Sequence, residues 1–294
     1  MFDAMSRAAK DAARRIDAPF VIQTQGLFNA YIEGRPLFVY TDYTELANLH
    51  ARPGYKTNSL RWLQRERRLY EQAQLVFAAS SDTRTSLVHD YGTSETKVVL
   101  THTGLNVAAP KDLPVRDREK FDVLFVGVDW KRKGGPDVLR AFAHVRQHIP
   151  HASLTVVGCR PSGEFPPGVR FVGEIPPKEL GDHFASASVF CLPAYQEPAG
   201  IAYTEAAAWG LPVVATTAGN IPDRVLHGRT GLLVEPGDVE GLTAALLQLA
   251  RDPDLRARFG MAGRSYALEN FSWQQIARVI AKAARPYLTK ARAV

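Results

Sequence analysis

Two carboxylates and the predicted start of a small-residue helix make the segment PAYQEPAGIAYTEAAAWGLPVVAT (193–216) the part of the chain most suited to chemistry. Glu197 follows a predicted strand, and Glu205 lies about one turn into the helix. The first amides of a helix have no partner within it, so they form a natural phosphate site; here they are the amides of Gly200, Ile201 and Ala202. Carboxylates in contact with a phosphate would repel it. We therefore expect Glu197 and Glu205 to accept hydrogen bonds from neutral hydroxyls on either side of it, one from a ribose and one from a sugar.

A second segment, FDVLFVGVDWKRKGGPDVLRAF (121–142), places positive charge after another predicted strand. The strand ends at Gly127, and a helix is predicted to open at Gly134-Gly135-Pro136. The turn between them is basic and consists of Lys131, Arg132 and Lys133. Such a turn is suited to phosphate, and a solvated turn without function is the competing interpretation.

The elements that must position these residues are those of an α/β protein. Short apolar runs alternate with amphipathic stretches, which indicates parallel sheets covered on both faces. The predicted strands are 19–24, 36–41, 74–79, 97–101, 121–127, 153–158, 169–173, 187–192 and 211–216. The predicted helices include 60–72, 137–149, 238–250 after a capping Asp238, one that opens at Asp252-Pro253, and 272–284, which continues past Pro286.

Length and composition exclude several other classes of protein. A chain of 294 residues with 46% hydrophobic and 22% charged residues suggests two globular domains. The net charge of +6 is spread along the chain, and no nucleic-acid-reading motif is present, so we expect no nucleic-acid partner. Two cysteines without a CxxC motif rule out a disulfide scaffold and a cysteine zinc site. The dinucleotide, P-loop, zincin and serine-hydrolase motifs are absent.

Two further features have competing interpretations. His144 and His148 are four residues apart on a predicted helix, but a role at the helix carboxyl end is favoured over metal binding. We therefore expect no metal site. The basic helix 60–72 suits peripheral contact with a membrane, and a solvated face with Trp62, Leu63 and Tyr70 buried is the favoured alternative.

The order of these elements resembles the retaining glycosyltransferases of family 4, which have the GT-B fold. The resemblance rests on Glu-x7-Glu at 197–205, the following GLPVVAT, and GNIPDRVLHGRTGLLVEPGD (219–238). It implies an α/β protein of the GT-B class with two facing Rossmann-like domains, the amino-terminal one incomplete. We expect an acceptor-side domain at 1–109, a nucleotide-sugar donor domain at 110–271, and a carboxyl-terminal crossover helix at 272–294.

The resemblance also implies roles for particular residues. Lys133 would contact the donor diphosphate, with Arg132 beside it, and these charges would replace a metal ion. Glu205 would hold the ribose and Glu197 the sugar hydroxyls. The loop around Ile175 would contact the nucleobase through its backbone. Many relatives carry an arginine directly after the strand-ending glycine. Here that position is Val128, so the second phosphate contact passes to Arg132 or Lys131.

Asp42 stands where many relatives of this family carry a histidine close to the transferred sugar. It directly follows the strand 36–41, and parallel α/β sheets bind ligands at that edge. Asp42 could hydrogen-bond the sugar or the acceptor hydroxyl. Capping of the next helix is an equally supported alternative.

The amino terminus departs from the family pattern. Complete relatives begin with a strand, a glycine-rich loop and further strands for which this chain has no counterpart. The strand PFVIQT (19–24) would then be an uncharged sheet edge, flanked by a helix face of Met5, Ala8, Ala12 and Ile16. We expect self-association through residues 1–30, a missing amino-terminal segment, or another polypeptide that supplies the rest of the domain.

The resemblance therefore predicts a glycosyltransferase of the hexosyltransferase type. It would move a sugar from a nucleotide-diphospho-sugar to a sugar or lipid-linked acceptor with retention of configuration. No separate cofactor is expected, because the nucleotide sugar is the donor substrate. A catalytically inactive nucleotide-sugar-binding module or subunit is the alternative. The expected location is the cytoplasm, with peripheral contact at the inner membrane face.

Overall fold

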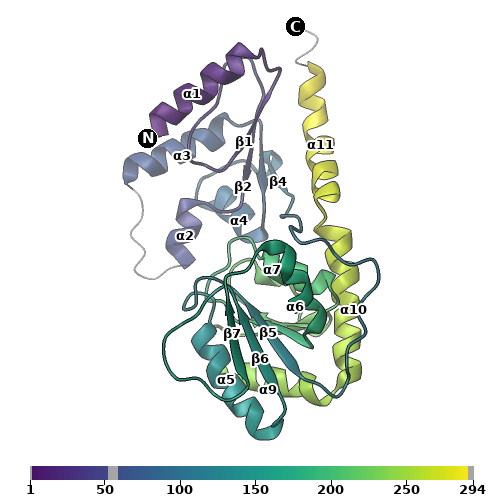
Figure 1. The fold of residues 1–294 in the computed structure, drawn as a ribbon. Helices are drawn as coiled ribbons and strands as arrows, with labels where there is room; N and C mark the ends of the chain where they lie inside the picture. The colour runs from purple at the N-terminus through teal and green to yellow at the C-terminus, as the bar shows by residue number, and fades with distance from the viewer. Residues whose placement is uncertain (1, 52–58, 291–294) are drawn as a thin grey trace. The chain divides into compact units, whose positions relative to one another are not determined.

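The computed structural model describes residues 2–51 and 59–290, which form two compact units (Figure 1). Unit 1 consists of Met1–Thr103 together with Trp273–Val294, and unit 2 consists of Gly104–Ser272. Each unit contains one sheet, and all the strand pairs of both sheets are parallel. The predicted α/β class is therefore confirmed.

The sheet of unit 1 has four strands in their chain order. They are β1 (Val21–Thr24), β2 (Leu37–Thr41), β3 (Leu75–Ala78) and β4 (Val98–Leu100). The helices of this unit are α1 (Phe2–Arg15), α2 (Glu45–Ala51), α3 (Leu60–Gln72), α4 (Ser81–His89), the short 3₁₀ turn η1 (Glu95–Lys97) and α11 (Trp273–Lys290).

Alternation along the strands gives this sheet two apolar faces. On one face, Leu37, Val39 and Val76 pack with Leu69 of α3 and Leu87 of α4. On the other face, Phe38, Leu75 and Phe77 pack with residues of the last helix, α11, which are Ile280, Ala283, Ala284, Tyr287 and Leu288. Because successive side chains of a strand point to opposite faces, neither set alone could bury this sheet. The end of the chain thus completes the core of its beginning.

The sheet of unit 2 has six strands in the order β10-β9-β8-β5-β6-β7. They are β5 (Asp122–Val126), β6 (Ser153–Val157), β7 (Val169–Gly173), β8 (Val189–Leu192), β9 (Val213–Thr216) and β10 (Gly231–Val234). The helices are α5 (Gly135–His148), the 3₁₀ turn η2 (Pro177–Glu179), α6 (Leu180–Ser186), α7 (Ile201–Ala208), α8 (Ile221–Arg224), α9 (Val239–Arg251) and α10 (Pro253–Asn270). Helix α5 packs against α9, and α7 packs against α10.

Acidic side chains start the two long helices near the end of unit 2. The Asp238 carboxylate accepts a hydrogen bond from the Gly241 amide at 2.8 Å, so Asp238 caps α9 as the sequence predicts. The Asp252 carboxylate accepts one from the Leu255 amide at 2.8 Å and starts α10. These caps explain why the two helices begin where the sequence places them.

The nine predicted strands are all present, with ends that differ by up to two residues. The sequence analysis missed β10, whose LLV core is short and flanked by polar turns. The predicted amino-terminal helix is present as α1, and Met5 and Ile16 of its predicted apolar patch are exposed. The helix buries Phe2, Ser6 and Ala13 instead, and the Phe2 ring meets Trp62 of α3 edge-on at 5.6 Å.

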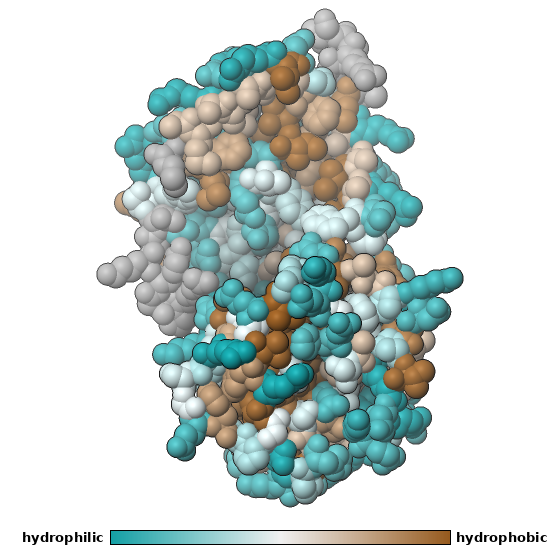
Figure 2. All heavy atoms as spheres, viewed as in Figure 1, coloured by the Kyte–Doolittle hydropathy of each residue, from teal (hydrophilic) through white to brown (hydrophobic). Residues whose placement is uncertain are grey.

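Strand β1 is an edge of its sheet, since among the described residues it pairs only with β2. Its Ile22 side chain is 51% exposed. On the face shown in Figure 2, hydrophobic side chains are visible in unit 1 between α1 and α11, where β1 lies. The expected self-association through residues 1–30 stays a prediction.

No helix in the described part of the chain combines the length and the hydropathy needed to span a bilayer.

We predict that Ala284→Glu unfolds unit 1 without unfolding unit 2. Ala284 is 4% exposed in the core that α11 forms with Phe38 and Phe77, so a carboxylate there has no partner and should cost about 3 kcal/mol or more. Ala281→Glu is the matched control, because Ala281 is an exposed residue of the same helix. Hydrogen exchange should rise in β2 and β3 of the Ala284 variant and stay low in β5. Equal protection of β2 and β3 in the two variants would contradict this role of α11.

Candidate donor site

Apart from Ile175, the predicted site residues of unit 2 follow two neighbouring strands in the middle of its sheet. Strand β5 is followed by the basic turn, and β8 is followed by the loop that carries Glu197. From β5 the chain builds outward through β6 and β7, and it then returns to the other side of β5 to add β8, β9 and β10. Ligands of parallel α/β sheets bind at the carboxyl edge where the strand order reverses in this way.

The two loops approach each other closely because of one glycine. Gly134 has a φ of +74°, and a Cβ built on it would lie 2.0 Å from the carbonyl oxygen of Pro193. Any other residue would push the loops apart. The Tyr195 amide also donates to the Arg132 carbonyl at 2.9 Å. The basic turn and the Glu197 loop therefore form one structure, as the sequence alone could not show.

This approach joins Lys133 to Glu197. The ammonium of Lys133 donates a hydrogen bond to Oε2 of Glu197, and the side chains are only 13% and 7% exposed, respectively. The other carboxylate oxygen, Oε1, accepts from the Gly200 amide at 3.1 Å, immediately before α7. The Lys133 ammonium and the Gly200 amide, at the start of α7, thus bind the same carboxylate.

The arrangement is an anion site in which Glu197 provides the anion. A lysine ammonium and the first amide of a helix are the groups that proteins use to bind phosphate. Gly200 has a φ of +67°, and a Cβ there would meet Arg224 and Asn220 at 3.0 Å. The position therefore requires glycine both for its backbone conformation and for space.

Arg132 faces the Glu197 loop. Its Nε donates to Asp129 at 3.1 Å, and its Nη1 donates to the Gln196 carbonyl at 2.8 Å. Lys131 and Val128 are exposed. Arg132 thus connects the two loops, and its predicted contact with the diphosphate stays a prediction.

Glu205 holds a different part of unit 2. It is 5% exposed, and its Oε1 accepts hydrogen bonds from the amides of Asn106 and Val107 at 3.0 and 2.9 Å. Burial raises the pKa of the Glu205 carboxyl above its ordinary value, and the two amide bonds partly offset this. The carboxylate therefore anchors the segment that enters unit 2, and its predicted contact with a ribose stays a prediction.

The amides of Ile201 and Ala202 belong to the first turn of α7, next to the Gly200 amide that Glu197 binds. Ile175 lies farther along the sheet, in the loop after β7, and is half-buried against the core of unit 2. The predicted contacts of Ile201 and Ala202 with phosphate, and of Ile175 with the nucleobase, stay predictions.

Asn220 is a residue of this edge that the sequence analysis did not single out. Its Nδ2 donates to the Pro198 carbonyl in the Glu197 loop. Its Oδ1 is buried and accepts no hydrogen bond within the described residues. A signal was present, since Gly219-Asn220 lies in the loop after the predicted strand 211–216, on the same edge.

In unit 1, Asp42 lies at the carboxyl edge of its own sheet and is half-buried. Its carbonyl accepts from the Thr83 hydroxyl at 2.7 Å. The helix-capping alternative for Asp42 is wrong, because the Thr44 hydroxyl accepts from the Ala47 amide at 3.1 Å and caps α2 instead. Contact of Asp42 with a sugar or an acceptor stays a prediction.

The same edge of unit 1 contains a buried carboxyl that the sequence analysis missed. Glu66 of α3 is 4% exposed and accepts hydrogen bonds from the hydroxyls of Tyr70 and Tyr91 and from the Glu45 amide. Burial raises the pKa of Glu66, and the hydrogen bonds act against that rise. The sequence suggested a basic solvated helix here, and nothing in its pattern marks one glutamate as buried.

Among the described residues, no three His, Cys, Asp or Glu side chains are placed to hold a metal ion together. His148 lies within hydrogen-bond distance of the His144 carbonyl, at 3.1 Å, as expected at the carboxyl end of a helix.

Comparison with known proteins agrees with the fold and identifies the family of the chain. Residues 120–252 match the family model described as "Glycosyl transferases group 1". The chain is 33% identical, over 71% of its length, to the GDP-mannose-dependent alpha-(1-6)-phosphatidylinositol monomannoside mannosyltransferase of Mycolicibacterium smegmatis. The chain belongs to the group 1 glycosyl transferases, of the family 4 type. It spans 61% of the length of that relative.

Solved structures share the GT-B fold with this chain. Sucrose-phosphate synthase from Thermosynechococcus elongatus matches with a TM-score of 0.78 and 22% identity, over 97% of this chain and 78% of that one. Anabaena HepE in complex with UDP matches with a TM-score of 0.77 and 19% identity, over 96% of this chain and 82% of that one. At these identities the likeness concerns the fold.

We predict that Glu205→Ala destabilises unit 2 and that Glu205→Gln does so much less. Alanine leaves the amides of Asn106 and Val107 without their acceptor, which should cost about 1–3 kcal/mol, whereas glutamine keeps an oxygen there. Urea unfolding measures the cost, and hydrogen exchange at these two amides locates it.

The same pair of proteins tests the charge of Glu205. A carboxyl whose pKa is raised in the folded state keeps its proton longer than in the unfolded state, so stability falls as pH rises above 4.5, its ordinary value. The wild type should lose stability relative to Glu205→Gln over that range. If the difference in unfolding free energy between the wild type and Glu205→Gln did not change with pH, burial would not raise the pKa of Glu205.

Proposed function

We propose that the chain transfers a sugar from a nucleotide-diphospho-sugar to an acceptor hydroxyl with retention of configuration. The observation that carries this proposal is the convergence of the Lys133 ammonium and the Gly200 amide on one point at the carboxyl edge of unit 2. A donor diphosphate is an anion that needs such groups, and family membership supports sugar transfer as the reaction.

In the proposed reaction, Lys133 stabilises the diphosphate as the glycosidic bond to its oxygen breaks. Arg132 and the amides of Gly200, Ile201 and Ala202 add to this stabilisation, so no metal ion is needed to offset the charge. The diphosphate takes over Lys133 and the Gly200 amide from Glu197. The Glu197 carboxylate is then released to accept hydrogen bonds from the sugar hydroxyls.

The remaining donor contacts follow from the positions of the other residues. Glu205 has a second carboxylate oxygen, Oε2, beyond the one bound by Asn106 and Val107, and this oxygen is available to ribose hydroxyls. The loop at Ile175 contacts the nucleobase through its backbone. UDP is bound by Anabaena HepE, which shares the fold, and this supports a nucleoside diphosphate as the leaving group.

Retention follows from attack on the face of the sugar that the diphosphate leaves. The leaving phosphate oxygen takes the proton of the acceptor hydroxyl, so no protein nucleophile takes part. Asp42 of unit 1 hydrogen-bonds the sugar or the acceptor hydroxyl. The mannosyltransferase relative is named for a phosphatidylinositol monomannoside, which supports a lipid-linked or sugar acceptor. We place the chain in the cytoplasm, in peripheral contact with the inner membrane face.

We predict that Lys133→Ala weakens binding of the matching nucleoside diphosphate by about 1.5–3 kcal/mol, because a charge-assisted contact is lost. A panel of UDP, GDP and ADP, measured by isothermal titration calorimetry with and without EDTA, identifies the base and tests for a metal. Lys120→Ala is the control for loss of one lysine, since Lys120 is exposed and precedes β5 at the opposite end of the strand.

Unchanged affinity of the Lys133 variant, or loss of wild-type binding in EDTA, would overturn the proposed site. Tight donor binding without transfer to any acceptor would favour the inactive binding module instead of the enzyme.

We predict that Glu205 binds the nucleotide part of the donor and that Glu197 binds its sugar part. Glu205→Gln should weaken the bare nucleoside diphosphate and the full nucleotide sugar alike. Glu197→Gln should leave the bare nucleotide bound at least as tightly, because it removes a negative charge that pairs with Lys133, and should weaken only the nucleotide sugar. Equal losses of bare-nucleotide affinity in both variants would rule out this division.

A further inference from the structure

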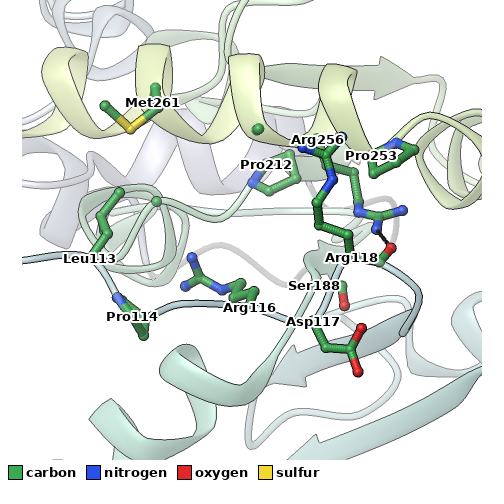
Figure 3. A pocket seen from close by; sticks show the side chains of 12 residues that line it. Leu113, Pro114, Arg116, Asp117, Arg118, Ser188, Pro212, Pro253, Arg256 and Met261 are labelled. Atoms are coloured by element: carbon green, nitrogen blue, oxygen red, sulfur yellow. Dashed lines mark hydrogen bonds between the residues drawn. The ribbon is translucent and has the colours of Figure 1, made fainter.

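Unit 2 has a cavity on the edge of its sheet opposite to the donor site. The cavity has a volume of about 220 Å³. Its lining includes Ser188 and Pro212, which directly precede the neighbouring strands β8 and β9 and therefore lie at the amino ends of those strands. Figure 3 shows the segment 113–118 along one side and α10 along the other.

This position separates the cavity from the donor site. Helix α7 begins beside Gly200 at the donor edge, and the chain reaches the cavity at Gly210, just after the helix ends. Eight helical residues span about 12 Å. A ligand in this cavity would therefore not occupy the place of the donor.

The lining combines apolar surface with arginines. Leu113, Pro114, Pro253, Ala257 and Met261 provide apolar contact. The charged side chains of the lining are those of Arg116, Arg118, Arg256 and Asp117. Three cations and one anion leave the walls with an excess of positive charge.

Two of these arginines are held without a carboxylate partner. Arg116 donates from Nε and Nη2 to the carbonyls of Ala187, Phe184 and Trp209, at 2.7–3.0 Å. Arg256, which is 7% exposed, donates to the carbonyls of Leu249, Ala250 and Arg118. Within residues 2–51 and 59–290, neither guanidinium forms an ion pair, whereas Arg118 pairs with Asp254 at 2.5 Å.

The carbonyls hold both guanidinium groups in place. They leave the formal charge of Arg116 without a counter-ion, whereas Asp252 and Glu119 lie near enough to Arg256 to favour its charge. Nη1 of Arg116 makes no hydrogen bond with the described residues, although five N–H donors belong to an arginine. Burial lowers the pKa of Arg116 to about 10, and no acidic group offsets it. The side chain nevertheless remains charged at neutral pH. Partly buried charges of this kind are stabilised by an anion.

We propose that this cavity is a second ligand site, which binds a small anion with an apolar part, such as a phosphate or carboxylate attached to a single ring. The anionic group meets Nη1 of Arg116 on the side where Arg256 adds positive charge. The ring packs on Leu113, Pro212 and Met261. The volume fits this class, since a cavity of about 150 Å³ accommodates benzene.

Met261 provides a reporter in the lining of the cavity, where it is 57% exposed. The chain has three methionines, and the other two, Met1 and Met5, lie near the amino terminus. In the full chain labelled with ¹³C at the methionine methyl groups, Met261→Leu assigns the cavity signal by its loss. Phenyl phosphate should shift the Met261 signal and leave the other two in place. Phenol, which lacks the charge, and inorganic phosphate, which lacks the ring, should each bind at least about tenfold more weakly.

A matched pair of variants tests the charge without removing an arginine. Ala257 is an exposed residue of α10 on the wall of the cavity. Ala257→Glu adds a carboxylate that competes for the guanidinium groups, and Ala257→Gln adds the same bulk without charge. Phenyl phosphate should bind the Glu variant about tenfold more weakly than the Gln variant.

Three results would overturn the proposal. The first is a Met261 signal that does not move in about 10 mM phenyl phosphate. The second is equal binding by the two Ala257 variants. The third is binding of phenol as tight as that of phenyl phosphate, which would leave an apolar cavity and no anion site.

Discussion

The close approach of two loops at Gly134 is the constraint on which the candidate donor site depends. The backbone there lies so near the Pro193 carbonyl that a side chain cannot be accommodated. Because β5 and β8 are neighbouring parallel strands, their following loops leave the sheet side by side. The glycine lets them touch, and Lys133 then reaches Glu197. The strand order brings the two loops together, the missing Cβ lets them touch, and the ion pair then forms between them.

The ion pair also explains how the proposed donor site is stable when no donor is bound. A buried lysine and the start of α7 would be costly to leave uncompensated, and the Glu197 carboxylate satisfies both. In the proposed reaction, the diphosphate replaces one anion by another, so little new charge has to be desolvated. The exchange releases Glu197 at the point where the sugar must be held.

The two units bury their sheets by using distant parts of the chain. In unit 1, α11 covers the face formed by Phe38, Leu75 and Phe77, although it follows those strands by about two hundred residues. In unit 2, Glu205 fixes the entering segment at Asn106 and Val107, and Arg116 fixes the next part to the ends of α6 and α7. Side chains that bind backbone groups thus hold the start of unit 2 in place. Arg116 does so with Nε and Nη2, and its Nη1 stays available to the cavity that it lines.

From the sequence alone one can predict the class of fold, nine of the ten strands found in the described residues, and the loops of the candidate donor site. These depend on local signals, namely continuous apolar runs, capping residues such as Asp238, and glycines at helix starts. Tertiary structure decided which groups meet. Residues distant in the chain decide that Lys133 binds Glu197 and that Glu66 is buried. The local backbone path decides that Thr44, and not Asp42, caps α2. Spacing along a sequence carries no information about such partners, because side-chain contacts and burial are set by packing between elements.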